Sequence, residues 1–398
     1  MRIQRALEDV VRDSTPGVPL VAIAKSNAEL LDGPHRRLVE DAVYELLVQI
    51  GESTPMELMA KDVKSLLTEK LMFPAKVFVK NEPHKRAKLV QRRFRVIWVQ
   101  SLILQIAERV MFGPAATVEI NDWANLSAKP GMGQTDGDFS IIQAAMRKMT
   151  EGSRLFDTDV SGWDLTLKFF MLIAFSYIHC LISGFRKDSW GWRVTFGLVV
   201  VQSRLVYTLP DGTVWSAVTR AGQYSGRYTT SYGNTKMRVF IAALFGRVAA
   251  AMGDDCNEAG VCTLDEVVRE YESILGAGNI EAVVHDEWQN AVFCSFRHIA
   301  PGRAIPVRYA RSLYRLLSKR KLIEADIMQF CEEVRHWDGE PALRQALEAH
   351  YVWQVGLHER SRQGPQGEES PSGAEAVVQE TQGVQVYEKD EPLPASDC

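Results

Sequence analysis

The order of the helical and strand-like segments limits the fold of this chain more than any other feature. Several segments repeat apolar residues with helical periodicity, at residues 38–50, 55–71, 101–112 and 264–275. Others are short runs of β-branched and aromatic residues, at residues 77–79, 96–99, 155–160, 205–209 and 291–296. Helices and strands alternate without a regular βαβ rhythm. The sequence therefore predicts an α+β fold with a small, mainly antiparallel sheet covered by helices.

Most of the chain has a globular composition, but its last forty residues differ. Apolar residues make up 46% of the 398 residues, which excludes a collagen-like, low-complexity or mainly disordered chain. Residues 359–398 carry nine acids and three bases with few large apolar side chains, so we expect a disordered acidic tail. Without this tail the net charge of −4 becomes +2. The overall acidity therefore does not exclude a nucleic-acid partner.

The cysteine pattern favours a reducing compartment, and the most apolar segment is too short to span a membrane. The six cysteines form no CxxC pair and no zinc-binding spacing with histidine. Residues 1–30 show no secretory signal. Residues 169–183 are strongly apolar, but they are fewer than the about 20 residues that cross a bilayer. We interpret this segment as a buried helix, with membrane contact as the alternative.

Residues 76–95 concentrate positive charge. They contain eight bases against the single acid Glu82. A run of like charges is often an exposed, solvated loop. The interleaved residues Val77, Phe78, Val79 and Phe94 favour instead a pair of strands that holds the bases in a row. Such a row suits a polyphosphate or a nucleic-acid backbone.

Two segments place carboxylates at strand ends. In residues 155–164 (LFDTDVSGWD) a short apolar strand leads to Asp159, and a Ser-Gly turn carries Asp164. In residues 252–256 (MGDDC) Gly253 permits a tight turn before the adjacent Asp254 and Asp255. Adjacent carboxylates repel each other unless a cation neutralises them, and Mg²⁺ prefers oxygen ligands. Each pattern alone also occurs in ordinary turns, so neither identifies a metal site by itself.

A Ser-Gly loop precedes a polar helix in residues 222–238 (GQYSGRYTTSYGNTKMR). Ser225 and Gly226 lie in the loop, while Thr230 and Asn234 are four residues apart and share one helical face. Polar groups on this face would suit the hydroxyls of a ribose. The alternative is a helix start with capping hydroxyls.

Taken together and in this order, these motifs resemble those of viral RNA-dependent RNA polymerases. Phrases such as KNEPHK, DVSGWD, the Ser-Gly…Asn-Thr segment and GDD are similar to the sobemovirus, barnavirus and polerovirus-like group. The resemblance implies a right-hand polymerase fold. It divides the chain into fingers (1–150), palm (151–185), a fingers insertion (186–221), palm (222–299), a small thumb (300–358) and the tail (359–398).

The resemblance also implies template-directed transfer of nucleotides to an RNA 3′-hydroxyl by a two-metal mechanism. The catalytic metal ligands would be Asp159, Asp254 and Asp255, with Mg²⁺ as the cofactor and Mn²⁺ as an alternative. The residues matched to NTP binding are Lys80, Lys88, Arg95, Asp164, Ser225, Thr230 and Asn234. Those matched to template and primer are Thr15, Gly17, Gly226, Phe293, Cys294 and Ser295.

The sequence departs from this family pattern in three places. The segment 258–290 contains no lysine that could act as the usual general acid, and His285 is the basic candidate for that role. The N-terminal part of the fingers is short, which predicts either a fragment of a longer polyprotein or a compact fingers domain. The thumb is also small, which suits initiation without a long primer.

The partners implied by the resemblance are an RNA template, nascent RNA and NTPs, without DNA. A genome-linked protein primer, and host membranes reached through other replication proteins, are further expected partners, and the expected location is the host cytoplasm. Two alternatives remain at this stage. One is a reverse transcriptase, against which the GDD sequence and Asn234 argue; the other is an inactive palm that acts as an RNA-binding scaffold.

Overall fold

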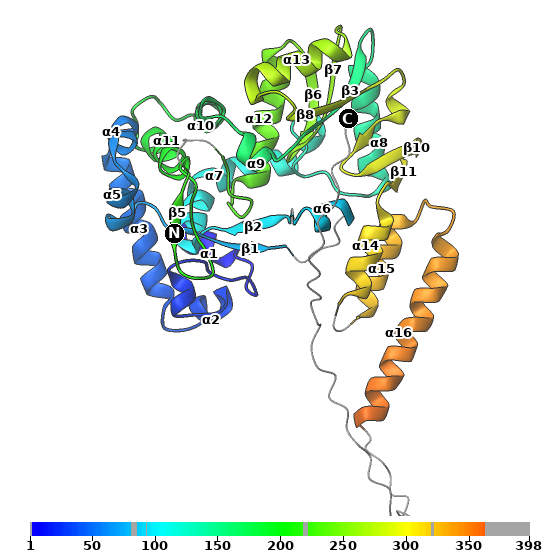
Figure 1. The fold of residues 1–398 in the computed structure, drawn as a ribbon, viewed down its shortest axis with the longest axis horizontal. Coiled ribbons are helices and arrows are strands. Elements are labelled where there is room, and N and C mark those ends of the chain that lie inside the picture. Colours follow the sequence, from blue (N-terminus) through cyan, green and yellow to red (C-terminus); the bar gives the residue numbers. More distant parts are fainter. Residues whose placement is uncertain (1, 81–85, 93, 218–221, 320–321, 363–398) are drawn as a thin grey trace, which may run out of the picture. The chain divides into compact units, whose positions relative to one another are not determined.

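The computed structural model describes residues 2–80, 86–92, 94–217, 222–319 and 322–362. The chain divides into two compact units, residues 1–347 and 348–398. The first unit is a mixture of helices and small sheets, which confirms the predicted α+β class (Figure 1). The described part of the second unit is the C-terminal portion of helix α16 (Glu340–Arg362). This helix continues four residues into the segment expected to be a disordered tail, and residues 363–398 lie outside the described residues.

The first sheet of the unit combines two strands from residues 75–99 with two from residues 206–216. Its strand order is β2-β1-β4-β5, with β1 and β4 parallel and the other pairs antiparallel. The elements of this region are α1 (Arg2–Glu8), α2 (Asn27–Leu31), α3 (Arg36–Glu52), α4 (Pro55–Ala60), α5 (Val63–Thr68), β1 (Ala75–Val79), α6 (Arg86–Val90), β2 (Val96–Val99), α7 (Leu102–Asn121), α8 (Asp136–Met149), α10 (Phe169–Ile182), α11 (Trp190–Gln202), β4 (Val206–Thr208) and β5 (Val214–Ser216).

The second sheet is antiparallel throughout, in the order β6-β7-β3-β8, and α12 and α13 lie against it (Figure 1). Its elements are β3 (Arg154–Val160), α9 (Trp163–Thr166), α12 (Thr230–Leu244), β6 (Val248–Met252), β7 (Asp255–Gly260), α13 (Leu264–Leu275) and β8 (Ile280–His285). A third antiparallel sheet and two helices follow: β9 (Val292–Phe293), β10 (Phe296–Ala300), β11 (Arg303–Pro306), α14 (Tyr309–Leu317) and α15 (Glu324–Val334).

Three predicted elements differ in the structure. The helix expected at 55–71 is broken at Lys61, because Lys61 is extended and Asp62 caps a new helix by accepting the Ser65 N–H. The strand expected at 291–296 is divided into β9 and β10 by a turn in which Cys294 and Ser295 both have positive φ. Residues 169–183 form helix α10 as predicted, but only one of its faces is buried. No helix in the described ranges is long and apolar enough to cross a membrane.

Candidate active site

Three of the predicted aspartates lie at one edge of the β6-β7-β3-β8 sheet. Thr158 of β3 pairs with Cys256 of β7, so Asp159 follows at the end of β3. Asp255 begins β7 and pairs with Met252 across the β6–β7 hairpin, whose turn carries Asp254. The end of β3 and the hairpin turn therefore meet at the same edge of the sheet.

A hydroxyl from α12 holds the hairpin turn in place. Gly253 has a φ of +65°, a conformation that favours glycine. Its N–H donates to Thr235 Oγ1 at 2.8 Å, and Thr235 is almost fully buried. Thr235 is part of the Asn-Thr pair of the sequence motif, but sequence reasoning did not assign it a role. The contact fixes the aspartate turn relative to the helix that carries Asn234.

The carboxylates of this edge influence each other electrostatically. Burial, followed by the charges of Asp254 and Asp159, raises the pKa of Asp255 to about 6. Burial and the charge of Asp254 likewise raise the pKa of Asp164 to about 6, whereas Arg95 opposes that increase. Asp164 and Arg95 therefore lie within electrostatic range of the aspartate cluster.

The donor chemistry of this cluster fits a hard divalent cation. In the ranges that the structure describes, no three Asp, Glu, His or Cys side chains converge closely enough to form a complete cation site. Carboxylates of like charge repel each other, and a cation offsets that repulsion. The charges of Asp254 and Asp159 contribute, after burial, to the raised pKa of Asp255. Asp159, Asp254 and Asp255 are thus the residues that could hold Mg²⁺ through oxygen.

The loop before α12 is fastened to Asp164 and to β2. The Gln223 N–H donates to the Asp164 carbonyl oxygen at 2.8 Å. The Trp98 N–H donates to Ser225 Oγ at 3.2 Å. A Cβ on Gly226 would lie 2.3 Å from the Trp98 carbonyl oxygen, so the close approach of the loop to β2 requires glycine. The loop that carries Ser225 and Gly226 is therefore held next to Asp164 and β2, while the role of these residues in NTP binding stays a prediction.

The two polar residues of α12 have different surroundings. Thr230 Oγ1 donates to the carbonyl oxygens of Tyr224 and Arg227, so this hydroxyl supports the loop. Asn234 is 4% exposed, and its Oδ1 is buried without a hydrogen-bond partner among the described residues. An unsatisfied buried acceptor is costly in free energy unless a ligand or water satisfies it. Asn234 is therefore the stronger candidate of the two for contacting a substrate hydroxyl.

Two buried ion pairs lock this region onto α7. Arg227 Nη2 lies 2.6 Å from Glu108 Oε1, and Lys236 Nζ lies 2.5 Å from Glu119 Oε1. All four side chains are less than one tenth exposed. Sequence reasoning missed these residues because nothing in the local pattern pairs positions more than a hundred residues apart.

Arg238 is a further residue that the sequence motifs did not single out. Its fully buried guanidinium donates from Nη2 to the Thr158 carbonyl oxygen at 2.9 Å. It also lies over the rings of Trp163 and Tyr271, with 5.4 and 5.2 Å to their centroids. Its charge opposes the rise in the pKa of Asp255. Arg238 therefore supports the strand that delivers Asp159.

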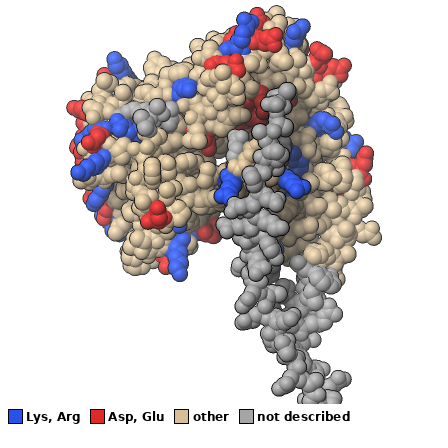
Figure 2. All heavy atoms as spheres, in the orientation of Figure 1, with Lys and Arg blue, Asp and Glu red and all other residues tan. Residues whose placement is uncertain are grey.

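The basic segment forms an antiparallel ribbon of β1 and β2. The Lys80 N–H donates to the Arg95 carbonyl oxygen at 2.8 Å, so these two residues lie side by side at the end of the ribbon. Lys88 lies in α6, and Glu82 lies outside the described residues. Figure 2 shows one face of the molecule, on which lysine and arginine side chains lie beside an opening near the middle.

The predicted template and primer residues lie in two separate loops. Gly17 has a φ of +69°, and a Cβ there would lie 2.7 Å from the Gln100 carbonyl oxygen. Thr15 Oγ1 in the same loop is buried without a hydrogen-bond partner in the described part of the chain. In the other loop, burial and the charges of Asp255 and Asp254 raise the pKa of Cys294. Cys294 is therefore close to the aspartate turn. Its neighbour Phe293 is buried, and its neighbour Ser295 is exposed.

His285 lies at the opposite end of β3 from Asp159. It pairs with Leu155, whereas Asp159 pairs with Glu281. Four residues of strand correspond to about 13 Å. His285 Nε2 contacts Asp157 Oδ2 at 2.8 Å. This contact gives His285 a structural role, and its role as general acid stays a prediction.

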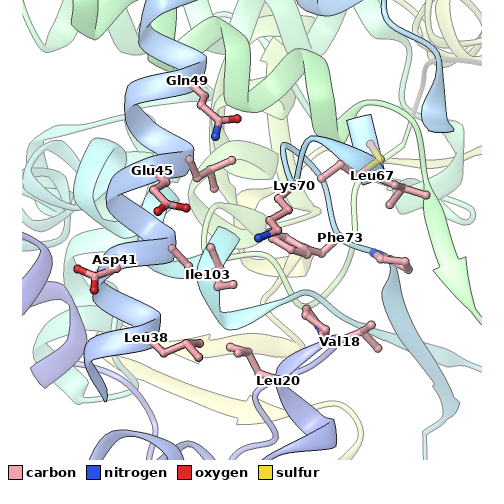
Figure 3. A pocket seen from close by; sticks show the side chains of 15 residues that line it. Val18, Leu20, Leu38, Asp41, Glu45, Gln49, Leu67, Lys70, Phe73 and Ile103 are labelled. Carbon is pink, nitrogen blue, oxygen red and sulfur yellow. The ribbon is translucent and has the colours of Figure 1, made fainter. Parts of the chain in front are cut away.

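A separate cavity of about 610 Å³ lies between α3 and the loop that follows Gly17 (Figure 3). Leu20, Leu38 and Ile103 give it an apolar lining, while Glu45 and Lys70 add charge. Its volume is typical of small-molecule sites. None of the aspartates of the candidate site lines it.

Comparisons with known proteins show what the chain is similar to. The family described as "Viral RNA-directed RNA-polymerase" matches residues 2–146. The RNA-directed RNA polymerase of Mushroom bacilliform virus is 29% identical over 343 residues, covering 79% of this chain and 78% of that protein. The replicase polyprotein P2AB of Southern bean mosaic virus is 29% identical over 86% of this chain, and protein P1-P2 of Potato leafroll virus is 28% identical over 79%.

The share of the relatives that is matched varies. This chain spans 35% of the Southern bean mosaic virus polyprotein and 30% of the Potato leafroll virus protein. The matches extend over most of this chain, including the segments that carry the aspartates and the basic ribbon. The chain is therefore similar to viral RNA-directed RNA polymerases and replicase proteins over most of its length.

Proposed function

We propose that this chain copies RNA by two-metal nucleotidyl transfer, with Asp159 and Asp254 as the principal metal ligands and Asp255 as an outer ligand. The observation that carries the proposal is the meeting of β3 and the β6–β7 turn, where burial, followed by the charges of Asp254 and Asp159, raises the pKa of Asp255. Bound Mg²⁺ would supply a lowered pKa for the RNA 3′-hydroxyl and would neutralise the triphosphate.

The residues of the chain position the reactants. Arg95 and Lys80 would bind the triphosphate, because phosphate oxygens are strong acceptors for cationic donors. Asn234, with an unsatisfied buried acceptor, and Asp164 would recognise the ribose 2′-hydroxyl. Ser225 and Thr230 would act mainly by holding the loop against β2 and α12. Thr15 and Gly17 would guide the template, while Phe293, Cys294 and Ser295 would contact the primer end.

This reaction suggests names for the parts of the fold. We propose residues 1–150 and 186–221 as fingers, 151–185 and 222–299 as palm, and 300–358 as thumb. The β6-β7-β3-β8 sheet falls within the palm ranges, and the β2-β1-β4-β5 sheet falls within the fingers ranges. A genome-linked protein primer and a replication complex in the host cytoplasm are part of the same proposal.

Primer extension on an RNA template tests the proposal. The full chain should incorporate NTPs in the presence of Mg²⁺, and Asp254→Asn should abolish incorporation. Asp286→Asn, a change of the same kind at an exposed residue, is the matched control and should retain activity. No incorporation by the unmodified chain, or equal incorporation by Asp254→Asn, would refute the mechanism.

A further inference from the structure

Helix α10 is apolar on two faces, and only one of them is covered. The covered face carries Met171, Leu172, Phe175, Ser176, His179 and Cys180. Phe175 stacks on Phe112 of α7 with 5.5 Å between the ring centroids. Ser176 and His179 are both on this buried side, so the Tyr177 phenol is the one polar group on the exposed side of the helix. A helix that is apolar all round normally lies inside a protein or in contact with lipid.

The opposite face forms a continuous apolar stripe. Phe170, Tyr177 and Leu181 are 46%, 57% and 64% exposed. With Ala174 they follow a spacing of four, three and four residues, which places them in one row on the helix. Ile182 extends the stripe at its C-terminal end and is also exposed. Contiguous exposed apolar surface of this kind marks an interaction site more often than isolated apolar residues do.

The surroundings of the stripe are positively charged. Residues 165–187 contain no Asp or Glu. Lys168 precedes the helix, and Arg186 and Lys187 follow it, so bases flank both ends of the stripe. None of these three bases forms an ion pair with the part of the chain that the structure describes. The charge therefore complements an anionic partner.

Charge also argues against a second copy of this chain as the partner. In an antiparallel pair of α10 helices, Lys168 of one copy would face Arg186 and Lys187 of the other. In a parallel pair each base would face the same base of the other copy. Both arrangements juxtapose like charges, and the three bases outnumber the single exposed acid, Asp188, that follows them.

The polarity of the stripe favours lipid over an acidic protein. A typical protein interface contains about 10 direct hydrogen bonds. Along the stripe, the Tyr177 phenol is the only side-chain group that can form one. The boundary between lipid headgroups and acyl chains requires no such partners, and aromatic and aliphatic side chains with nearby bases are typical of helices that lie there.

We propose that the exposed face of α10 docks on an anionic lipid bilayer. Phe170, Tyr177 and Leu181 enter the boundary between headgroups and acyl chains, while Arg186 and Lys187 contact lipid phosphates. This direct contact goes beyond RNA synthesis and beyond membrane attachment through other replication proteins. It binds the chain to a membrane surface through one face of a helix that lies along the interface.

Vesicle co-sedimentation of the full chain tests the proposal. The chain is mixed with vesicles of phosphatidylcholine alone, or of phosphatidylcholine with one third phosphatidylserine, in the presence of saturating RNA oligonucleotide. The RNA occupies the basic ribbon, which would otherwise bind anionic lipid by itself. The chain should bind the serine-containing vesicles and lose most of that binding at high salt.

Two variants separate the apolar and the charged contributions. Leu181→Glu should weaken binding more than tenfold, whereas Val261→Glu, at a site 90% exposed after β7, should not change it. Arg186→Gln with Lys187→Gln should weaken binding by about thirtyfold, since each base near an anionic surface contributes a factor of about five. Arg147→Gln with Lys148→Gln, an exposed adjacent pair on α8, is the charge-matched control.

Solution measurements distinguish this proposal from its rivals. Primer extension without lipid should be unchanged in Leu181→Glu, so failure of the polymerase mechanism and failure of docking give different results. Equal vesicle binding by Leu181→Glu and Val261→Glu would overturn the proposal. So would a concentration-dependent dimer that Leu181→Glu dissociates, which would identify a second copy as the partner of α10.

Discussion

Two regions of the molecule differ in how their charged side chains are surrounded. One is the basic ribbon of β1 and β2. The other, the α7–α12 frame, consists of the ion-paired residues Glu108, Glu119, Arg227 and Lys236. In the frame each acid of α7 meets a base at 2.6 Å or less, away from solvent. In the ribbon the bases lie among exposed apolar residues, and Phe78, Val79 and Phe94 are all more than 40% exposed. One region neutralises its charges internally, and the other presents them to solvent.

The difference follows from what each region has to do. A buried charge is costly unless it is paired, so the frame has one arrangement of low free energy. That arrangement fixes the loop of Ser225 and, through Thr235, the aspartate turn. Exposed charges incur a much smaller cost, because water solvates them in the folded chain as well. The proposed function therefore predicts that catalytic geometry depends on the frame and substrate capture on the ribbon.

Breaking the frame should have the largest effect on stability. Glu108→Gln leaves Arg227 buried without a counter-charge and should lower the free energy of unfolding by about 3–5 kcal/mol. Asp41→Asn breaks the exposed Arg37–Asp41 pair and should lower it by less than about 1 kcal/mol. Urea unfolding measures both values. Similar losses in the two variants would remove the contrast between buried and exposed charge.

The pH dependence of the free energy of unfolding tests the burial of another ionisable residue, His298. Burial lowers the pKa of His298 to about 4, against about 6.5 in an unfolded chain. Between these values the unfolded state binds more protons, so the free energy of unfolding falls as the pH is lowered from about 6.5 to about 4. The loss should approach about 3 kcal/mol for this residue. His298→Gln should flatten this part of the profile, and an unchanged slope would contradict the assignment.

The sequence predicted single strands and turns better than the long-range contacts that hold them in place. Strand and turn signals predicted the local positions of Asp159, Asp254 and Asp255, and β2 was placed at its observed bounds. The role of these aspartates as metal ligands came from the family resemblance and stays a prediction. Glu108 and Arg227 were missed because their pairing depends on tertiary packing across 119 positions. The break at Lys61 was missed because apolar periodicity continues across a capping residue. Local patterns carry no information on which buried charges will meet.

Removing the Thr235 hydroxyl should show whether the position of the Gly253 turn affects activity separately from the stability of the chain. Thr235→Val leaves the Gly253 N–H without its acceptor, and an unsatisfied donor costs about 1–3 kcal/mol. Primer extension should slow by roughly tenfold with little change in KM, and Thr235→Ser should restore it. Thr195→Val removes a buried hydroxyl from α11 and serves as the control. If Thr195→Val slowed extension equally, the effect would be one of stability and not of turn position.

The smallest effect on stability is expected in the ribbon itself. Arg95 is exposed, so Arg95→Gln should change the free energy of unfolding by less than about 0.5 kcal/mol. The KM for NTP should nevertheless rise two- to fivefold, equivalent to the about 0.5–1 kcal/mol of an exposed charge contact, and the rise should shrink with added salt. Arg95→Lys should retain most of the affinity, and Arg147→Gln should leave KM unchanged. A loss of stability comparable to that of Glu108→Gln would place Arg95 with the frame, because only a buried, paired charge contributes that much to folding.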